Sequence, residues 1–140
     1  MKILLAVDGS DFTKRMLAYV AAHDEWLGAA HQYTVLTVIP AIPPRAAAIL
    51  DHALIQSYYN DEAENVFAPL RSFFAQGKMA AEFMWKAGPV ADTIAATADE
   101  GRFSLLIMGT HGHGVLGGLV MGSTTTKVIA QSRVPILLVR

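Results

Sequence analysis

The sequence contains no cysteine among its 140 residues. Disulfide bonds, thiol catalysis and cysteine-ligated zinc or iron–sulfur sites are therefore excluded. The apolar opening, residues 2–7, is similar to the start of a signal peptide, but Asp8 ends it before the length that the apolar region of such a peptide needs. We therefore expect a cytoplasmic protein, with which the absence of cysteine is compatible.

Long apolar runs and a strong net charge are also missing. Hydrophobic residues make up 53% of the chain, yet none of their runs approaches the roughly eighteen positions of a transmembrane helix. The formal net charge is −1, so we expect neither a nucleic acid nor a membrane as a partner. All 12 acidic residues lie at or before Glu100. The segment 101–140 would therefore tolerate an anion, although chance segregation explains the asymmetry equally well.

Strand and helix patterns alternate along the chain. Continuous apolar or β-branched runs predict strands over residues 2–7, 33–39, 80–85, 104–108 and 136–139. Apolar residues at helical spacing predict helices over 11–27, 46–75, 89–99 and 124–131. Pro69 lies inside the second of these helices and should kink or split it.

This order of elements predicts the fold and the place of a site. Strands that alternate with helices imply right-handed crossovers and a parallel sheet covered on both faces. We predict an α/β protein with a single domain, residues 1–140, and a doubly wound, Rossmann-like sheet of five parallel strands. Such folds bind ligands beyond the carboxyl ends of the strands, where the strand order reverses. The candidate positions are therefore 8–10, 38–40 and 109 onward.

The segment 109–127 is unusually rich in glycine, with six of the 11 glycines of the protein. Glycine adopts positive φ and lets backbone N–H groups approach a ligand, so a strand-to-helix loop of this kind can wrap phosphate oxygens. Gly122 and Ser123 then open a helix whose N-terminus favours an anion, and the hydroxyls of Ser123, Thr124 and Thr125 could add hydrogen bonds. A mobile loop or a close contact between helix and strand is the alternative explanation.

Two better-known phosphate motifs fit this sequence poorly. Residues 112–117 match the G-x-G-x-x-G dinucleotide pattern, but no acidic residue follows position 100 to bind a ribose. A Walker loop is excluded, because the only Gly-Lys pair, at 77–78, is not followed by Ser or Thr.

The spacing of Gly109, Gly112 and Gly122-Ser123 resembles the G-2x-G-9x-G-S/T signature of the ATP-binding universal stress proteins. The similarity extends to the strand endings at 7–10 and 38–40 and to the terminal segment 134–139. The resemblance implies a fold like that of the adenine nucleotide α-hydrolases, ATP as the ligand, with or without Mg²⁺, and a regulatory function in the stress response.

The resemblance also assigns residues to the nucleotide. The adenine end would lie against Ala6 to Asp8 and Val38, and the ribose and phosphates against the signature residues. The full set is Ala6, Val7, Asp8, Val38, Met108, Gly109, His111, Gly112, His113, Gly122, Ser123, Thr124 and Thr125. Many relatives carry Lys or Arg within 115–118, where this chain has Val-Leu-Gly-Gly, so His113 and Lys127 are its candidate sources of positive charge.

Few residues suggest chemistry beyond binding. His111 and His113 form a His-x-His pair without a third ligand nearby, so we expect no dedicated metal site, and Mg²⁺ would arrive with ATP. No residue near the loop is placed to orient an attacking group, and we predict no catalytic residue. A slow ATPase or phosphotransferase stays open as an alternative, as does a dimeric interaction module that binds no nucleotide.

The last predicted strand, Ile136–Val139, suggests self-association. Its four apolar residues carry no charge between Pro135 and Arg140, and an unprotected apolar edge invites pairing. We expect a homodimer through this strand, the arrangement that is common in the resembled family, and an unidentified protein is a further candidate partner. A helix or loop of the same chain that covers the edge is the alternative.

Overall fold

The computed structural model describes residues 1–113 and 120–140. The strands are β1 (Lys2–Ala6), β2 (Gln32–Ile39), β3 (Ala81–Ala87), β4 (Leu105–Gly109) and β5 (Ile136–Val139). They form one sheet in the order β3-β2-β1-β4-β5, in which every pair of neighbours is parallel. The predicted doubly wound sheet of five parallel strands is therefore confirmed.

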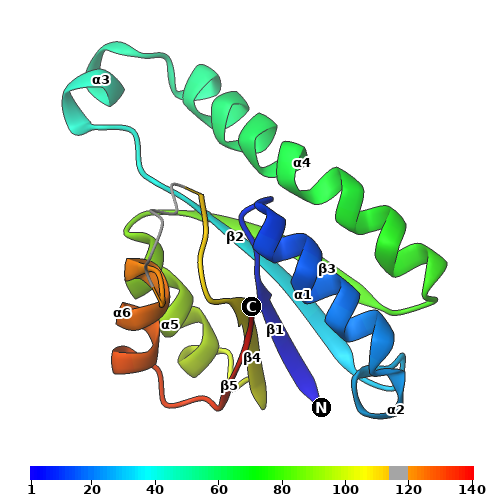
Figure 1. The fold of residues 1–140 in the computed structure, drawn as a ribbon. Helices are drawn as coiled ribbons and strands as arrows, with labels where there is room; N and C mark the ends of the chain where they lie inside the picture. Colours follow the sequence, from blue (N-terminus) through cyan, green and yellow to red (C-terminus); the bar gives the residue numbers. More distant parts are fainter. Residues whose placement is uncertain (114–119) are drawn as a thin grey trace.

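The helices lie on both faces of this sheet (Figure 1). They are α1 (Asp11–Ala22), α2 (Asp24–Leu27), α3 (Pro44–Ile49), α4 (His52–Gln76), α5 (Val90–Glu100) and α6 (Ser123–Gln131). The helices α1 and α4 lie on one face, and α5 and α6 on the other. Within the residues that the structure describes, no helix combines the length and apolarity needed to cross a membrane.

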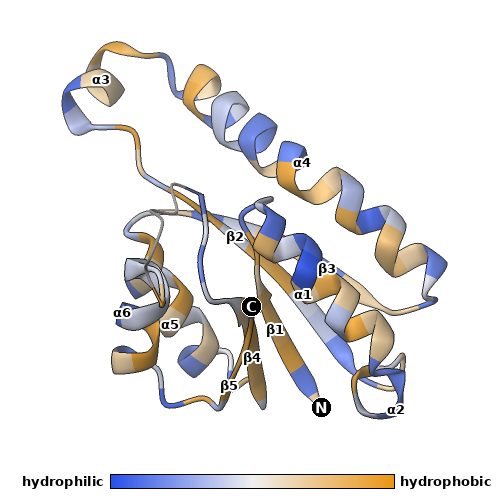
Figure 2. Ribbon diagram, in the orientation of Figure 1, coloured by the Kyte–Doolittle hydropathy of each residue, from blue (hydrophilic) through white to orange (hydrophobic). Residues whose placement is uncertain are grey.

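The strands of the sheet centre are buried on both faces. In β1, Ile3 and Leu5 join the core beneath α1 and α4, whereas Leu4 joins the core beneath α5 and α6, and all three are 0% exposed. Burial of one such side chain stabilises the fold by about 1.5–3 kcal/mol. Figure 2 shows β1 and β4 apolar over most of their length, the pattern expected of parallel strands covered by helices on both sides.

The helix predicted over 11–27 is interrupted, which corrects that prediction. His23 has φ −125° and ψ 48°, outside the helical region, and separates α1 from α2. Its Nδ1 lies 2.8 Å from the carbonyl oxygen of Tyr19. The imidazole therefore donates a hydrogen bond to this carbonyl oxygen, which lies at the end of α1 and has no backbone N–H as its partner.

The prediction that Pro69 could split its helix is wrong, because α4 runs unbroken from His52 to Gln76. Pro69 is exposed and lies between the buried side chains of Phe67 and Leu70. The packing of these two residues outweighs the roughly 3 kcal/mol that a proline costs inside a helix. The break falls earlier, between α3 and α4, where the Asp51 side chain accepts a hydrogen bond from the backbone N–H of Ala53 and caps α4.

The strand order reverses between β1 and β4. The chain leaves β1 toward α1 on one face and leaves β4 toward α6 on the other, so a crevice opens at the carboxyl ends of the two strands. The order also places β5 at one edge of the sheet, as predicted for the last strand, and β3 at the opposite edge.

Candidate functional site

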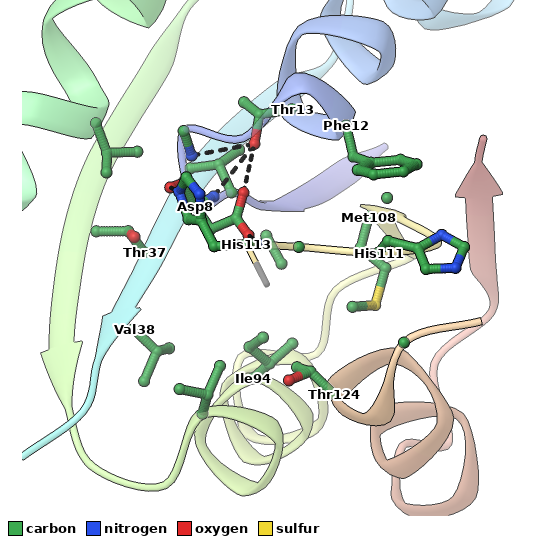
Figure 3. Close-up of a pocket in the computed structure, with 18 of the residues that line it drawn as sticks. Asp8, Phe12, Thr13, Thr37, Val38, Ile94, Met108, His111, His113 and Thr124 are labelled. Carbon is green, nitrogen blue, oxygen red and sulfur yellow. Dashed lines mark hydrogen bonds between the residues drawn. The ribbon is translucent and has the colours of Figure 1, made fainter. Parts of the chain in front are cut away.

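A pocket of about 850 Å³ lies at the carboxyl ends of β1, β2 and β4 (Figure 3). All thirteen residues of the predicted nucleotide-binding set, from Ala6 to Thr125, line it. The central part of the glycine-rich loop, including residues 115–118 and two glycines of the 112–117 pattern, lies outside the described residues. Lining residues beyond the predicted set are Gly9, Phe12, Thr13, Thr37, Ile39, Pro40, Glu62, Asn65, Val66, Val90 and Ile94.

One wall of the pocket is apolar. Ala6 and Val38 pack against the core cluster that contains Met108 and Ile94, beneath α5 and α6. Figure 3 shows Val38, Ile94 and Met108 around the same open space. An apolar wall with a few polar groups around it is typical of a site for a small organic molecule.

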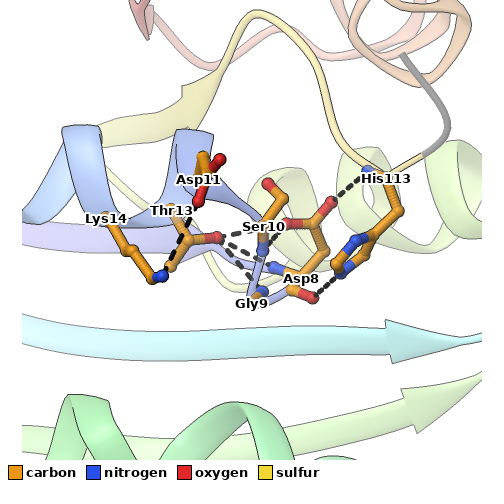
Figure 4. A network of polar contacts seen from close by, with 7 residues as sticks. All are labelled: Asp8, Gly9, Ser10, Asp11, Thr13, Lys14 and His113. Carbon is orange, nitrogen blue, oxygen red and sulfur yellow. Dashed lines mark hydrogen bonds and ion pairs between the residues drawn. The ribbon is translucent and has the colours of Figure 1, made fainter.

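Asp8 organises the turn between β1 and α1 (Figure 4). Its Oδ1 accepts hydrogen bonds from the backbone N–H of Ser10 at 2.9 Å and from the Thr13 hydroxyl at 3.2 Å. The Thr13 oxygen in turn accepts from the N–H groups of Asp8 and Gly9, both at 3.2 Å. Gly9 has φ +78°, a conformation that favours glycine. The Asp-Gly-Ser sequence therefore builds a rigid end to β1.

His113 joins the start of the glycine-rich loop to this turn. Its backbone N–H donates to Oδ2 of Asp8 at 3.2 Å, and its Nε2 lies 2.7 Å from the Asp8 carbonyl oxygen. A carbonyl oxygen only accepts, so Nε2 carries the proton in this contact. The Asp8 carboxylate thus has three donors and about one acceptor position left for another partner.

The three glycines of the signature differ in whether the fold leaves room for a side chain at their position. A Cβ on Gly109 would lie 2.7 Å from the Cβ of Phe12, and one on Gly112 would collide with Oδ2 of Asp8. Close packing therefore explains both residues. Gly122 has φ −72° and ψ 160°, which any residue adopts, and a Cβ there would lie 3.4 Å from its nearest neighbours. The fold alone gives no strong reason for a glycine at position 122.

Gly122 precedes α6, whose first turn faces the pocket. Ser123 and Thr124 line the pocket, and the N-terminus of the helix provides N–H groups and a dipole that favour an anion. Thr125 has a different role, because its hydroxyl donates to the carbonyl oxygen of Gly109 at 3.0 Å and its residue is only 2% exposed. Thr125 ties α6 to the end of β4, so its hydroxyl is already engaged.

Charged and titratable groups are few in the pocket. The described lining contains Asp8, Glu62, His111 and His113, but no Lys or Arg, and Lys127 is exposed outside it. The His111 ring packs against Phe12 with centroids 4.9 Å apart. Among the described residues, no three His, Cys, Asp or Glu side chains are grouped so that they could hold a metal ion.

Comparison with known proteins gives consistent similarities. The family model described as the universal stress protein family matches residues 1–140. A universal stress protein of Thermus aquaticus is 33% identical over 142 positions, which cover 99% of this chain and 97% of that protein. A solved structure of a universal stress protein of Lactobacillus plantarum superposes with a TM-score of 0.76 at 20% identity, covering 100% of this chain and 97% of that one. That of Archaeoglobus fulgidus in complex with dAMP superposes with a TM-score of 0.69 at 21% identity, covering 100% and 98%.

Proposed function

The chain belongs to the universal stress protein family, and from this premise we propose that it binds an adenine nucleotide in the pocket at the carboxyl ends of β1, β2 and β4. The observation that carries the proposal is Gly122, a glycine for which neither backbone angles nor packing give a strong reason, placed where the pocket meets the N-terminus of α6. A phosphate that approaches this N-terminus closely would require a residue without a side chain. The relative from Archaeoglobus fulgidus that was solved with dAMP supports the same ligand class.

In the proposed complex the adenine ring packs on the apolar wall formed by Ala6, Val38 and Met108. The remaining acceptor position of Asp8 contacts the nucleoside. The phosphates lie against Gly122, Ser123 and Thr124, where the hydroxyls and the helix N-terminus stabilise negative charge without a lysine or arginine from the described lining. We propose ATP as the ligand, with any Mg²⁺ held mainly by its phosphates and by water.

Mass spectrometry of the protein, purified natively and then denatured, tests the proposal. We expect an adenine nucleotide to be released in an amount comparable to that of the chain. The Gly122→Val variant, prepared in the same way, is the control and should release none. A wild-type protein that releases no nucleotide and takes up none when incubated with ATP would refute the proposal.

We also propose that the chain forms a homodimer through β5. This strand lies at an edge of the sheet, and Ile136, Leu137 and Leu138 are only partly buried. A second copy that offers the same strand would cover the edge in a closed, two-fold arrangement. In such a dimer, nucleotide occupancy at each pocket could change the association with a further protein, which is the regulatory role that we propose in the stress response.

Sedimentation equilibrium distinguishes a dimer from a monomer. The wild-type protein should sediment as a dimer, and Leu138→Lys as a monomer with an unchanged circular dichroism spectrum. Leu54→Lys is the matched control, because Leu54 is 57% exposed on α4, away from β5, and should leave the dimer intact. A monomeric wild-type protein at micromolar concentration would contradict the dimer.

A further inference from the structure

Large apolar side chains are exposed mainly in one part of the described structure. Of the eight such side chains, four lie within residues 49–58: Ile49 at 85% exposed, Leu50 at 38%, Leu54 at 57% and Tyr58 at 45%. We call these four residues the arm surface, because α3 and the first turns of α4 project beyond the carboxyl ends of the strands (Figure 1). The other four come from separate segments of the chain. Single exposed apolar residues are ordinary, whereas a group of them marks an interaction site.

The first turns of α4 are apolar on two faces. Ile55 and Tyr59 pack in the core on the inner face. Leu54 and Tyr58, one helical turn apart, are exposed on the outer face, and no residue of α3 is buried. A helix that only covers a sheet carries polar residues on its outer face. The second apolar face of α4 therefore fits a partner that packs on it from outside.

Contacts behind the arm surface hold it in place. The backbone N–H of Ile42 donates to the Tyr59 hydroxyl at 2.9 Å, and the Tyr59 ring stacks on Trp85 with centroids 5.3 Å apart. The Trp85 indole N–H donates to the side-chain oxygen of Asn60 at 3.0 Å. These contacts fix the first turns of α4 to the end of β3. A surface that is already ordered loses little conformational entropy when it binds a partner.

The charges around the arm surface determine which partner fits it. Asp61 and Glu62 follow Tyr58 by three and four positions, so both carboxylates border the apolar stripe of α4. Both residues are exposed, and neither takes part in an ion pair with a described residue. Residues 45–62 contain three acidic residues and one basic residue. Because like charges repel, this surface disfavours a second copy of itself and an anionic membrane, and it favours basic residues beside an apolar face.

We propose that the arm surface docks an amphipathic helix of another protein, with the apolar face of that helix on the arm surface and a lysine or arginine toward Asp61 and Glu62. Apolar residues one turn apart on α4 form a ridge against which a second helix packs. The inference goes beyond the proposed function, because it depends on the arm surface alone and not on a bound nucleotide. Glu62 also lines the pocket, so the docked helix would lie beside the pocket.

Fluorescence anisotropy with two labelled model helices tests the inference on the nucleotide-free protein. Both peptides carry leucine on one face, and they differ only in having lysine or glutamate beside it. We expect the lysine peptide to bind saturably and the glutamate peptide to bind at least about tenfold more weakly. Leu54→Lys should weaken binding of the lysine peptide by about tenfold or more, because it places a positive charge in the apolar stripe. Ile129→Lys, at a 42% exposed residue of α6, is the control and should leave the affinity unchanged.

A second variant tests the contribution of charge. Asp61→Asn should weaken binding of the lysine peptide by roughly threefold and make its affinity less dependent on salt, because one of the two bordering carboxylates is lost. Glu64→Gln is the matched control on the same helix. Glu64 is paired with Arg71 at 2.7 Å and does not line the pocket, so its variant should keep the wild-type affinity.

The inference is overturned if the lysine peptide does not bind saturably, if both peptides bind equally, or if neither Leu54→Lys nor Asp61→Asn changes the affinity. Wild-type tetramers that Leu54→Lys reduces to dimers in sedimentation equilibrium would assign the arm surface to a second copy and overturn it as well. Leu54 does not line the pocket, so Leu54→Lys should bind ATP as the wild type does. A wild-type protein that binds the lysine peptide but no ATP would refute the proposed function alone.

Discussion

The two ends of the pocket were built in different ways. The α6 end comes from one stretch of chain, in which the residues at the end of β4 and those that open α6 carry a glycine and hydroxyl pattern. The α4 end comes from Thr37 in a strand and from Glu62 and Asn65, two exposed residues of a long helix, without any motif. The difference shows that one end of a pocket can be marked by a pattern that is local in sequence, whereas the other end depends on how distant elements pack.

The largest effect is expected at the α6 end. Gly122→Val should reduce ATP affinity by about a hundredfold or more, since the branched side chain would occupy the space between the ligand and the N-terminus of α6. Titration calorimetry measures this loss. Thermal unfolding provides the control for folding, because the backbone angles at Gly122 suit a non-glycine residue. Unchanged affinity would contradict the proposal that the phosphates of ATP lie at the N-terminus of α6.

Asp8 lies between the two ends and should show an intermediate effect. Asp8→Ala removes the acceptor of Ser10, Thr13 and His113, so we expect AMP, ADP and ATP to be weakened alike, by about tenfold. Asp11→Ala is the control, because Asp11 is exposed and forms a surface ion pair with Lys14, at 3.6 Å. A loss confined to ATP would instead place Asp8 beside the phosphates.

Thr125 tests whether the α6 end depends on an internal hydrogen bond. Thr125→Val leaves the carbonyl oxygen of Gly109 without its side-chain donor, and we expect the free energy of unfolding to fall by about 1–2 kcal/mol. Urea denaturation measures the change. The adjacent Thr126→Val is the control, because the Thr126 hydroxyl also donates to a carbonyl oxygen, that of Gly122 at 3.0 Å, but in an exposed position. Its loss should be less than about 0.5 kcal/mol. Equal losses would argue against the role given to Thr125.

The smallest effect concerns a contact remote from both ends of the pocket. Hydrogen bonds from the Ser132 hydroxyl at 2.9 Å and from the Arg133 N–H at 3.1 Å lower the pKa of Asp99 from its ordinary value of 3.8. A carboxylate with a lowered folded-state pKa stabilises the fold above its unfolded-state pKa, and this contribution disappears as the pH falls through the folded value. Asp99→Asn should therefore be slightly less stable than wild type at about pH 7 and equally stable at about pH 2. A stability difference that is independent of pH would contradict this assignment.

The sequence was sufficient for most of the fold, because parallel strands buried on both faces appear as continuous apolar runs, such as residues 2–7. It failed where side chains decide helix boundaries, as at His23 and Asp51, and where packing overrides an unfavourable residue, as at Pro69. In the pocket, the glycine spacing located one end. Glu62 and Asn65 gave no signal, because exposed polar residues on a helix look alike until the packing of α4 is known.

The central claim, that this pocket binds an adenine nucleotide, is tested most directly by calorimetric titration of the wild-type protein, freed of any bound nucleotide, with ATP. We predict saturable binding of one ATP for each chain, which Gly122→Val abolishes and Glu64→Gln preserves. A titration without saturable binding, or binding that Gly122→Val leaves unchanged, would contradict the claim.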